Sequence, residues 1–127
     1  MSKPAAVLDV GNCDPDHGMI RRMLTQHFDV EIDRVMFVDD ALARMRERAY
    51  DLVMFNRLIF DDGSEGLELV SRAKTETGIK PAPIMMISNF DEAQSACEAA
   101  GGVRGFGKKA VGDKATVEHL SKYLPRK

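Results

Sequence analysis

The segment that most constrains the fold is a short apolar run near the middle of the chain, Leu52-Val53-Met54-Phe55, with polar residues on both sides. The run is too short for a helix and is typical of a strand buried on both faces, as in a parallel sheet between two helical layers. In open α/β sheets, ligands bind outside the carboxyl ends of the strands. Asn56 and the loop at residues 58–63 are therefore predicted to lie where a site would be, and an amide occupies the strand end.

The composition predicts a single domain, residues 1–127, with a sizeable core, because 44% of the residues are hydrophobic. The net charge of -2 and the lack of a basic block argue against direct binding of nucleic acid. There is no signal-peptide pattern and no apolar run near the roughly 18 residues of a membrane span. We therefore expect a cytoplasmic protein that binds no membrane. Cys13 and Cys97 have no CxxC pattern and are predicted to be buried free thiols.

Five strand patterns alternate with five helical patterns along the chain. The strands are predicted at residues 5–10, 30–35, 50–56, 84–87 and 103–106. The helices are predicted at residues 14–28, 39–49, 66–77, 91–100 and 113–124. Right-handed crossovers then predict a flavodoxin-like, doubly wound α/β fold, whose five-stranded parallel sheet has the order 2-1-3-4-5.

Cap residues mark the ends of several of these helices. Asp14 is predicted to be the N-cap of the first helix, with Pro15 at the first helical position. Asp39-Asp40 is predicted to cap the second helix. Gly78 is predicted to end the third helix in a left-handed conformation, and Gly101-Gly102 to end the fourth.

The order of several short motifs resembles that of a known family. Asp14-Pro15 follows the first strand, Tyr50-Asp51-Leu52-Val53 leads to a polar residue at position 56, and Gly66-Leu67-Glu68-Leu69 comes after the loop. Pro83-Ile84-Met85-Met86-Ile87-Ser88 and a lysine after Gly105-Phe106 complete the pattern. Together these motifs span nearly the whole chain and resemble bacterial response-regulator receiver domains, the CheY-like family of two-component phosphorelay signal transduction.

The resemblance implies a phosphorylation site that is degenerate in this chain. In the family, an aspartate that ends strand 3 accepts the phosphoryl group, and Asn56 stands at that position here. Two acidic residues after strand 1 help the family to hold Mg²⁺, and Asn12 and Cys13 stand at those positions. Ser88 matches the family's switch hydroxyl at the end of strand 4.

The family's lysine at the end of strand 5 corresponds to Lys108 or Lys109. Lys109 would place Phe106 where an aromatic switch residue usually lies, whereas Lys108 places Gly105 there. Lys108 is the preferred assignment, and Phe106 is the candidate switch aromatic. A hydrogen bond from Lys108 to the side-chain oxygen of Asn56 would hold the neighbouring loop without a charged acceptor.

The residues at these positions argue against phosphoryl transfer. Transfer to a carboxylate needs an anionic oxygen nucleophile and a divalent cation, and the Asn56 amide has no such oxygen. Mg²⁺ prefers hard oxygen ligands, whereas Cys13 offers a soft sulfur. We therefore predict weak or absent Mg²⁺ binding, no other metal and no cofactor. His17, His27 and His119 share no ligand spacing and are predicted to have structural roles.

These observations predict an atypical receiver, or pseudo-receiver, that lacks the acceptor aspartate, catalyses no reaction and acts through contact with a signalling protein or an output domain. One alternative is a receiver that still responds to phosphorylation or another input through an unconventional acidic residue such as Asp14 or Asp61. The other is a flavodoxin-like enzyme or small-ligand binder that uses Ser88 and Lys108. A nucleophilic serine needs a base, however, and no histidine lies in the strand-end segments.

The predicted contact surface consists of the helix at 91–100, the strand at 103–107 and the helix at 113–124, and it is also a possible homodimer interface. The helix at 91–100 is rich in alanine, so it should bury little area and be held weakly. The strand is expected at a sheet edge, where unpaired backbone groups can bind a partner. The alternative is that the small residues only bring the helix close to the sheet. Nearby lysines, Lys108, Lys109 and Lys114, would then prevent self-association through this edge and keep the protein monomeric.

Overall fold

The computed structural model describes residues 3–127 and contains one five-stranded parallel sheet of order β2-β1-β3-β4-β5, as predicted. The strands are β1 (Ala5–Val10), β2 (Val30–Val35), β3 (Leu52–Asn56), β4 (Ile84–Ile87) and β5 (Val103–Phe106). The helices are α1 (Asp14–His27), α2 (Val38–Glu47), α3 (Glu68–Thr75), α4 (Asp91–Ala100) and α5 (Lys114–Leu120), with a short 3-10 helix, η1 (Lys108–Ala110).

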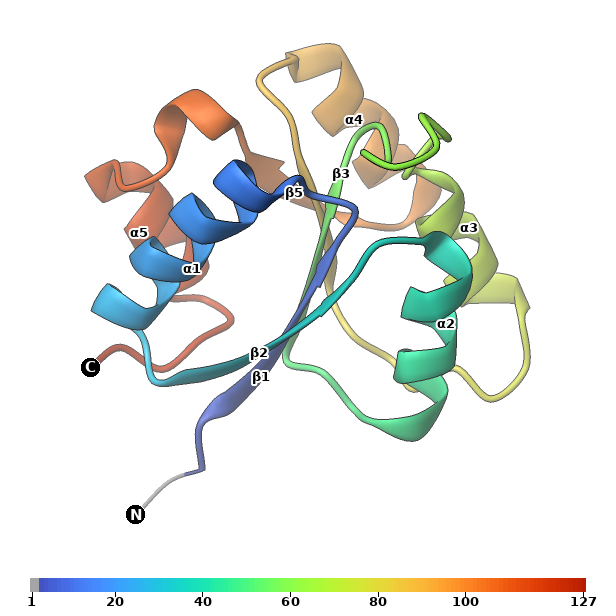
Figure 1. Ribbon diagram of the computed structural model, residues 1–127, viewed down its shortest axis with the longest axis horizontal. Helices are drawn as coiled ribbons and strands as arrows, with labels where there is room; N and C mark the ends of the chain where they lie inside the picture. Colours follow the sequence, from blue (N-terminus) through green and yellow to red (C-terminus); the bar gives the residue numbers. More distant parts are fainter. Residues whose placement is uncertain (1–2) are drawn as a thin grey trace.

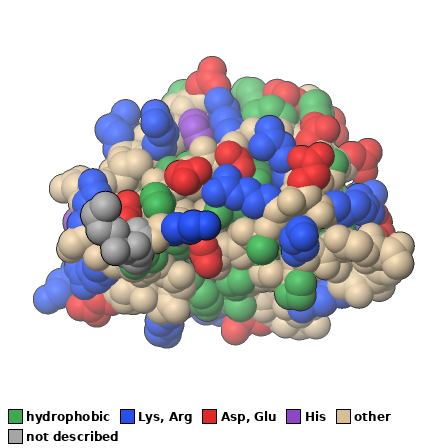
Figure 2. Space-filling view, turned by 90° about the horizontal axis from the view of Figure 1, so that it is seen from below, with side chains coloured by type: hydrophobic (Ala, Val, Ile, Leu, Met, Phe, Trp, Pro, Cys, Tyr) green, Lys and Arg blue, Asp and Glu red, His purple; other side chains and the backbone are tan. Residues whose placement is uncertain are grey.

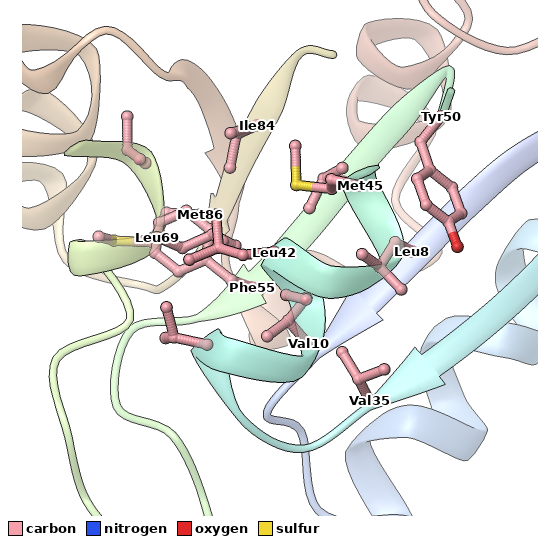
Figure 3. Packing of buried hydrophobic residues seen from close by; sticks show 14 of the residues in the cluster. Leu8, Val10, Val35, Leu42, Met45, Tyr50, Phe55, Leu69, Ile84 and Met86 are labelled. Atoms are coloured by element: carbon pink, nitrogen blue, oxygen red, sulfur yellow. The ribbon is translucent and has the colours of Figure 1, made fainter. Parts of the chain in front are cut away.

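Two helical layers cover the sheet, with α1 and α5 on one face and α2, α3 and α4 on the other (Figure 1). Successive side chains of each central strand enter opposite layers, because side chains alternate along a strand. In β3, Val53 and Phe55 pack in the cluster beneath α2 and α3, where Figure 3 shows Leu42 of α2 close to Phe55. Leu52 and Met54 pack in the second cluster, beneath α1 and α5. These four side chains are fully buried, whereas Asn56 at the end of the strand is only partly buried.

The starts of two helices differ from the prediction. α1 begins at Asp14, with Cys13 as its N-cap residue, so Asp14 is the first helical residue and does not cap the helix. Its carboxylate instead lies 2.8 Å from a guanidinium nitrogen of Arg34 on β2. α2 begins at Val38, which leaves Asp39-Asp40 in the first turn without a capping hydrogen bond. Carboxylates in a first turn still interact favourably with the helix dipole.

The carboxyl ends of α3 and α5 come earlier than predicted. α3 ends at Thr75, and the next residue, Glu76, has an extended backbone conformation. The Glu76 carboxylate forms ion pairs with Arg46 and Arg72. α5 ends at Leu120, because the chain continues as turns through Leu124. α4 ends as predicted at Gly101, whose φ of 107° is left-handed.

Side-chain hydrogen bonds that the alanine-rich sequence did not predict join α4 and α5 to the edge strand β5. The side chain of Gln94, 4% exposed, donates hydrogen bonds to the carbonyl oxygens of Met86 and Ser88 at 3.0 and 3.1 Å. Its oxygen accepts the Gly105 N–H at 2.8 Å. On the other side, Nε2 of His119 bonds to the Arg104 carbonyl oxygen at 2.6 Å. The Gly105 N–H and the Arg104 carbonyl of β5 are therefore already hydrogen-bonded to side chains of the neighbouring helices. The sequence had predicted that such edge groups would be open to a partner.

The surface near the amino-terminal ends of the strands carries Lys and Arg side chains interspersed with Asp and Glu (Figure 2). Hydrophobic side chains on this face form only small patches between the charges. In the part of the chain that the structure describes, no helix has both the length and the hydropathy needed to cross a bilayer.

Candidate functional site at the strand ends

A pocket of about 220 Å³ opens at the carboxyl ends of β3 and β4, where Asn56 lies beside Ile87 in the sheet. We call it the strand-end pocket. It is lined by Asn56, Arg57, Leu58, Ile87, Ser88, Asn89, Phe90 and Lys108. Three residues predicted from the sequence to share a site, Asn56, Ser88 and Lys108, therefore line the same pocket.

Asn56 uses its side chain to hold the loop that follows β3. Its Nδ2 donates a hydrogen bond to the carbonyl oxygen of Leu58 at 2.5 Å. Leu58 in turn forms an isolated antiparallel bridge with Glu65, which closes the loop at its base. The expected hydrogen bond between Asn56 and Lys108 is not formed in the structure, because the lysine has another partner.

Lys108 forms an ion pair with Asp16 of α1, in which Nζ lies 2.6 Å from Oδ2. Burial raises the pKa of the Asp16 carboxyl, but hydrogen bonds from Lys108 and from the Cys13 thiol outweigh burial and hold that pKa below its usual value. Lys109 does not line the strand-end pocket; its side chain is exposed and its backbone N–H donates to Asn89 Oδ1 at 3.1 Å. Lys108 thus lines the strand-end pocket and Lys109 does not, and the assignment of Lys108 as the family's lysine stays a prediction.

Asn12 and Cys13 lie at the junction of β1 and α1 and do not line the strand-end pocket. Asn12 is fully buried, its Nδ2 donates to Asp9 Oδ1 at 2.5 Å, and its backbone carbonyl accepts a hydrogen bond from Arg34 at 2.8 Å. Cys13 is only partly buried, which corrects the prediction for this thiol, whereas Cys97 is buried as predicted. Burial raises the pKa of the Cys97 thiol above its usual value.

Asp9 and His17 form a buried pair that the sequence analysis did not identify. Asp9 is fully buried on β1, and its Oδ2 bonds to Nδ1 of His17 on the first turns of α1. The sequence did carry a signal, since Asp9 is the only charged residue within the apolar strand Ala5–Val10. A buried carboxylate is rarely tolerated without a partner, and a histidine eight residues later could have been considered as that partner.

Each acidic side chain at the β1–α1 junction is therefore paired with a basic side chain of the same chain. Asp9 pairs with His17, and Asp14 and Asp16 pair with cationic groups brought from β2 and η1, Arg34 and Lys108. Within residues 3–127, no group of three or more His, Cys, Asp or Glu side chains is arranged to hold a metal ion. Mg²⁺ would need carboxylate oxygens that are free to bind it. These residues do not fit a Mg²⁺ site of the kind that the family resemblance implies.

Ser88 and Phe106 have different environments. The Ser88 side chain accepts a hydrogen bond from the Phe90 N–H at 3.1 Å, which leaves its hydroxyl hydrogen free to donate into the pocket. Phe106 is buried in the cluster beneath α1 and α5. At position 105 a Cβ atom would lie 2.0 Å from the Met86 carbonyl oxygen, so the strand requires glycine there. The role of Phe106 as a switch aromatic stays a prediction.

The loop after β3 contains an acidic turn. Asp62 accepts hydrogen bonds from the backbone N–H and the hydroxyl of Ser64, at 2.9 and 2.6 Å, and these lower the pKa of its carboxyl. Gly63 has a left-handed φ of 69°. Asp61 is exposed and lines a separate hollow together with Cys13 and other residues near the start of α1.

No family model matches the sequence, and no curated protein matches it. Among solved structures, a protein from Chloroflexus aurantiacus assigned as a response regulator has a TM-score of 0.80 and 22% identity, over 96% of this chain and 98% of that one. A CheY-like receiver domain from Methylobacillus flagellatus has a TM-score of 0.71 and 24% identity, over 94% and 98% of the two chains. NtrX from Brucella abortus has a TM-score of 0.74 and 21% identity, over 95% of this chain and 27% of its own.

These similarities show that the chain has the fold of response-regulator receiver domains, the CheY-like fold. They confirm the architecture expected from the motifs, including the strand order 2-1-3-4-5 and the five helices.

Proposed function

We propose that this chain is a receiver-type signalling domain that acts by binding another protein and does not accept a phosphoryl group. The observation that carries the proposal is the set of contacts between acidic and basic side chains at the β1–α1 junction, the Asp9–His17 hydrogen bond and the Asp14–Arg34 and Asp16–Lys108 ion pairs. A divalent cation would have to compete with these basic side chains for the carboxylate oxygens.

The strand-end chemistry supports the same proposal. Phosphoryl transfer to a side chain needs an oxygen nucleophile in line with the donor, and a cation that neutralises the crowded negative charge. Asn56 supplies a neutral amide whose nitrogen is already bonded to Leu58. Lys108, which could stabilise an anion, is bonded to Asp16. In this proposal the domain keeps one arrangement of these groups, and its signal is read through contact with its partner.

The proposed partner is a signalling protein or an output domain, in the same chain or in another one. NtrX offers a precedent for the first case, since the similar region makes up 27% of that chain. The face formed by α4, β5 and α5 is one candidate contact surface, and the same face would serve a homodimer. Because side chains already satisfy Arg104 O and Gly105 N of β5, we propose contact through side chains and not through an added strand.

A second candidate surface is favoured by the exposed aromatic side chains of the strand-end loops. Phe60 and Phe90 are 61% and 62% exposed, and Leu58, two residues before Phe60, is also exposed. Two double variants separate the surfaces: Arg104→Glu/Lys114→Glu for the first and Phe60→Ser/Phe90→Ser for the second. Sedimentation and a pull-down from the native host are the measurements. Loss of binding in one variant identifies the surface, and unchanged binding and self-association in both would reject the two surfaces.

Exposure of the protein to Mg²⁺ and a small phosphodonor tests the absence of phosphorylation. We expect the intact mass to stay unchanged, because the nucleophile and the cation ligands are both absent. Asn56→Asp alone should recover little labelling, whereas Asn56→Asp/Cys13→Asp should bind Mg²⁺ more tightly, because it adds two carboxylates. Asn12 stays unchanged in these variants, because its side chain contacts the buried Asp9 carboxylate. Stoichiometric phosphorylation of the unchanged protein would falsify the proposal.

The position of any label would separate the proposal from its alternative. Asp61 is exposed, and within residues 3–127 it forms no ion pair, so it is the acidic residue best placed to act as an unconventional acceptor. Peptide mapping that places the phosphoryl group on Asp61, and its loss in Asp61→Asn, would establish the alternative of a receiver with a displaced acceptor.

A further inference from the structure

A separate pocket lies at the opposite end of β4 from the strand-end pocket. It has a volume of about 340 Å³ and opens between the last turns of α2 and α3 and the segment that leads into β4. Ile84, the first residue of β4, is part of its wall. We call it the α2–β4 pocket. Its volume falls at the lower end of the roughly 300–1,000 Å³ of small-molecule pockets, so a small ligand fits it best.

Apolar side chains form most of the lining of this pocket. They are Met45, Ala73, Ile79, Pro81, Ala82 and Ile84. Met45 and Ile84 belong to the core cluster beneath α2 and α3, and Figure 3 shows their side chains close together. The Lys80 N–H donates to the Met45 carbonyl oxygen at 3.0 Å, which holds the segment before β4 against the end of α2. Such a lining can bury a short hydrocarbon chain.

The charged groups around the pocket leave two cations without an acidic partner. Glu76 is the acidic residue of the lining, and its two oxygens form ion pairs with Arg46 and Arg72. Hydrogen bonds from these arginines, that from Arg72 above all, hold the pKa of the Glu76 carboxyl below its usual value. Lys74 and Lys80 also line the pocket, and among residues 3–127 neither forms an ion pair.

The ends of two helices reduce this positive charge without cancelling it. The carboxyl ends of α2 and α3 both lie at the pocket, and each carries roughly half a negative charge from the helix dipole. Lys74 and Lys80 bring two full positive charges. The stem of Lys74 lies over Gly101, where a Cβ atom would be 2.8 Å from Lys74 Cε. The pocket therefore combines an apolar lining with a cationic rim.

We propose that the α2–β4 pocket binds a short aliphatic carboxylate reversibly. The hydrocarbon chain contacts Met45, Ile79 and Ile84, and the carboxylate pairs with Lys74 and Lys80. A carboxylate with an apolar tail complements both parts of the lining, whereas a purely polar anion or an uncharged hydrocarbon complements only one. The site uses no residue of the strand-end pocket, so the inference goes beyond the proposed function and does not depend on it.

Titration of the whole chain with hexanoate at constant pH and ionic strength, followed by backbone amide chemical shifts, tests the proposal. We expect saturable shifts at Ile79, Lys80 and Ile84. Butanoate should bind about fivefold more weakly, because it places two fewer methylenes against the apolar lining. 1-Hexanol and hexylamine keep the chain without the negative charge and should also bind about fivefold more weakly. Absence of saturable shifts with hexanoate, or equally tight binding of hexylamine, would overturn the proposal.

Removal of the cations tests the charged part of the lining. Lys74→Gln and Lys80→Gln should each weaken hexanoate binding about threefold, because each removes one partner of the carboxylate. Lys122→Gln is the control, because it removes an equal exposed charge outside the pocket and should leave the affinity unchanged. Equal effects of the three variants would mean that only net charge matters and would overturn the proposal.

Filling of the pocket tests the apolar part of the lining. Ala82→Leu places a larger side chain in the pocket and should weaken hexanoate binding about tenfold, whereas Ala96→Leu on the exposed side of α4 should not change it. A cooperative urea transition shows that each variant folds. Unchanged binding in folded Ala82→Leu would contradict the proposal. If Ala82→Leu does not fold, the lysine variants and the ligand series decide the proposal by themselves.

Discussion

The two halves of the strand-end edge satisfy their charges in different ways. Around β1 and α1, the buried carboxylate of Asp9 and its neighbours are matched by basic side chains of the chain itself. At the ends of β3 and β4, the strand-end pocket has the uncharged side chain of Asn56 in its lining. The cation Arg57 also lines this pocket, and Arg57 has no ion-pair partner among residues 3–127. In the first half each of these carboxylates has a basic partner, whereas the cation Arg57 in the second half has no acidic one among residues 3–127.

Burial accounts for the pairing of Asp9 in the first half. A carboxylate removed from water must be paired, because its desolvation is otherwise too costly. Arg57 lies at the mouth of a pocket where water can solvate its charge, so it needs no internal partner. Lys108 links the two halves, since it lines the pocket and pairs with Asp16 of α1.

Replacing His17 by alanine should have the largest effect on stability. The change leaves the fully buried carboxylate of Asp9 with the Asn12 amide as its remaining side-chain partner. Loss of one member of a buried pair costs roughly 3–5 kcal/mol, measurable by urea denaturation. Asp14→Ala is the control, because it breaks a pair whose carboxylate is 89% exposed and should cost about 1 kcal/mol or less. Equal losses would refute the claim that buried pairing stabilises the β1 half.

Replacing Gln94 by alanine should destabilise the β4–β5 half by about 2 kcal/mol, because it leaves buried backbone groups of Met86 and Gly105 without their bonds. Hydrogen exchange should accelerate at the Gly105 amide in particular. Ser95→Ala, on the exposed side of the same helix, is the control and should change neither quantity. If the Gly105 amide exchanges at an unchanged rate in Gln94→Ala, α4 is not held in the way described here.

Replacing Asp16 by asparagine should have the smallest effect, and it depends on pH. The folded pKa of Asp16 lies below its ordinary value of 3.8, so its pairing adds stability above that value, which is lost as the pH falls through the lowered pKa. The unchanged protein should therefore lose more stability than Asp16→Asn between neutral pH and pH values below 3.8. The difference should be about 1 kcal/mol or less, since the pair is partly exposed. A larger acid sensitivity in the variant would contradict the assigned direction.

The α4–β5 edge shows where sequence patterns did not suffice. The alanines of α4 correctly indicated a helix that buries few apolar side chains, and glycines correctly marked β5 as a short edge strand. The inference that the backbone groups of β5 are open was wrong, because it did not consider side-chain hydrogen bonds, and the weak hold on α4 stays a prediction. Gln94 and His119 supply hydrogen bonds that no periodicity reveals.

The sequence by itself determined the order of strands and helices, the strand at Leu52–Asn56 and the placement of an amide at its end, because hydrophobic periodicity and turn residues are local properties. Only the tertiary structure decided which charges meet. Asp9 meets His17 because α1 packs over β1, and Lys108 meets Asp16 because η1 brings the lysine against α1. Such pairings depend on helix orientation and sheet register across distant parts of the chain, and a buried charge requires a partner without specifying where in the sequence that partner lies.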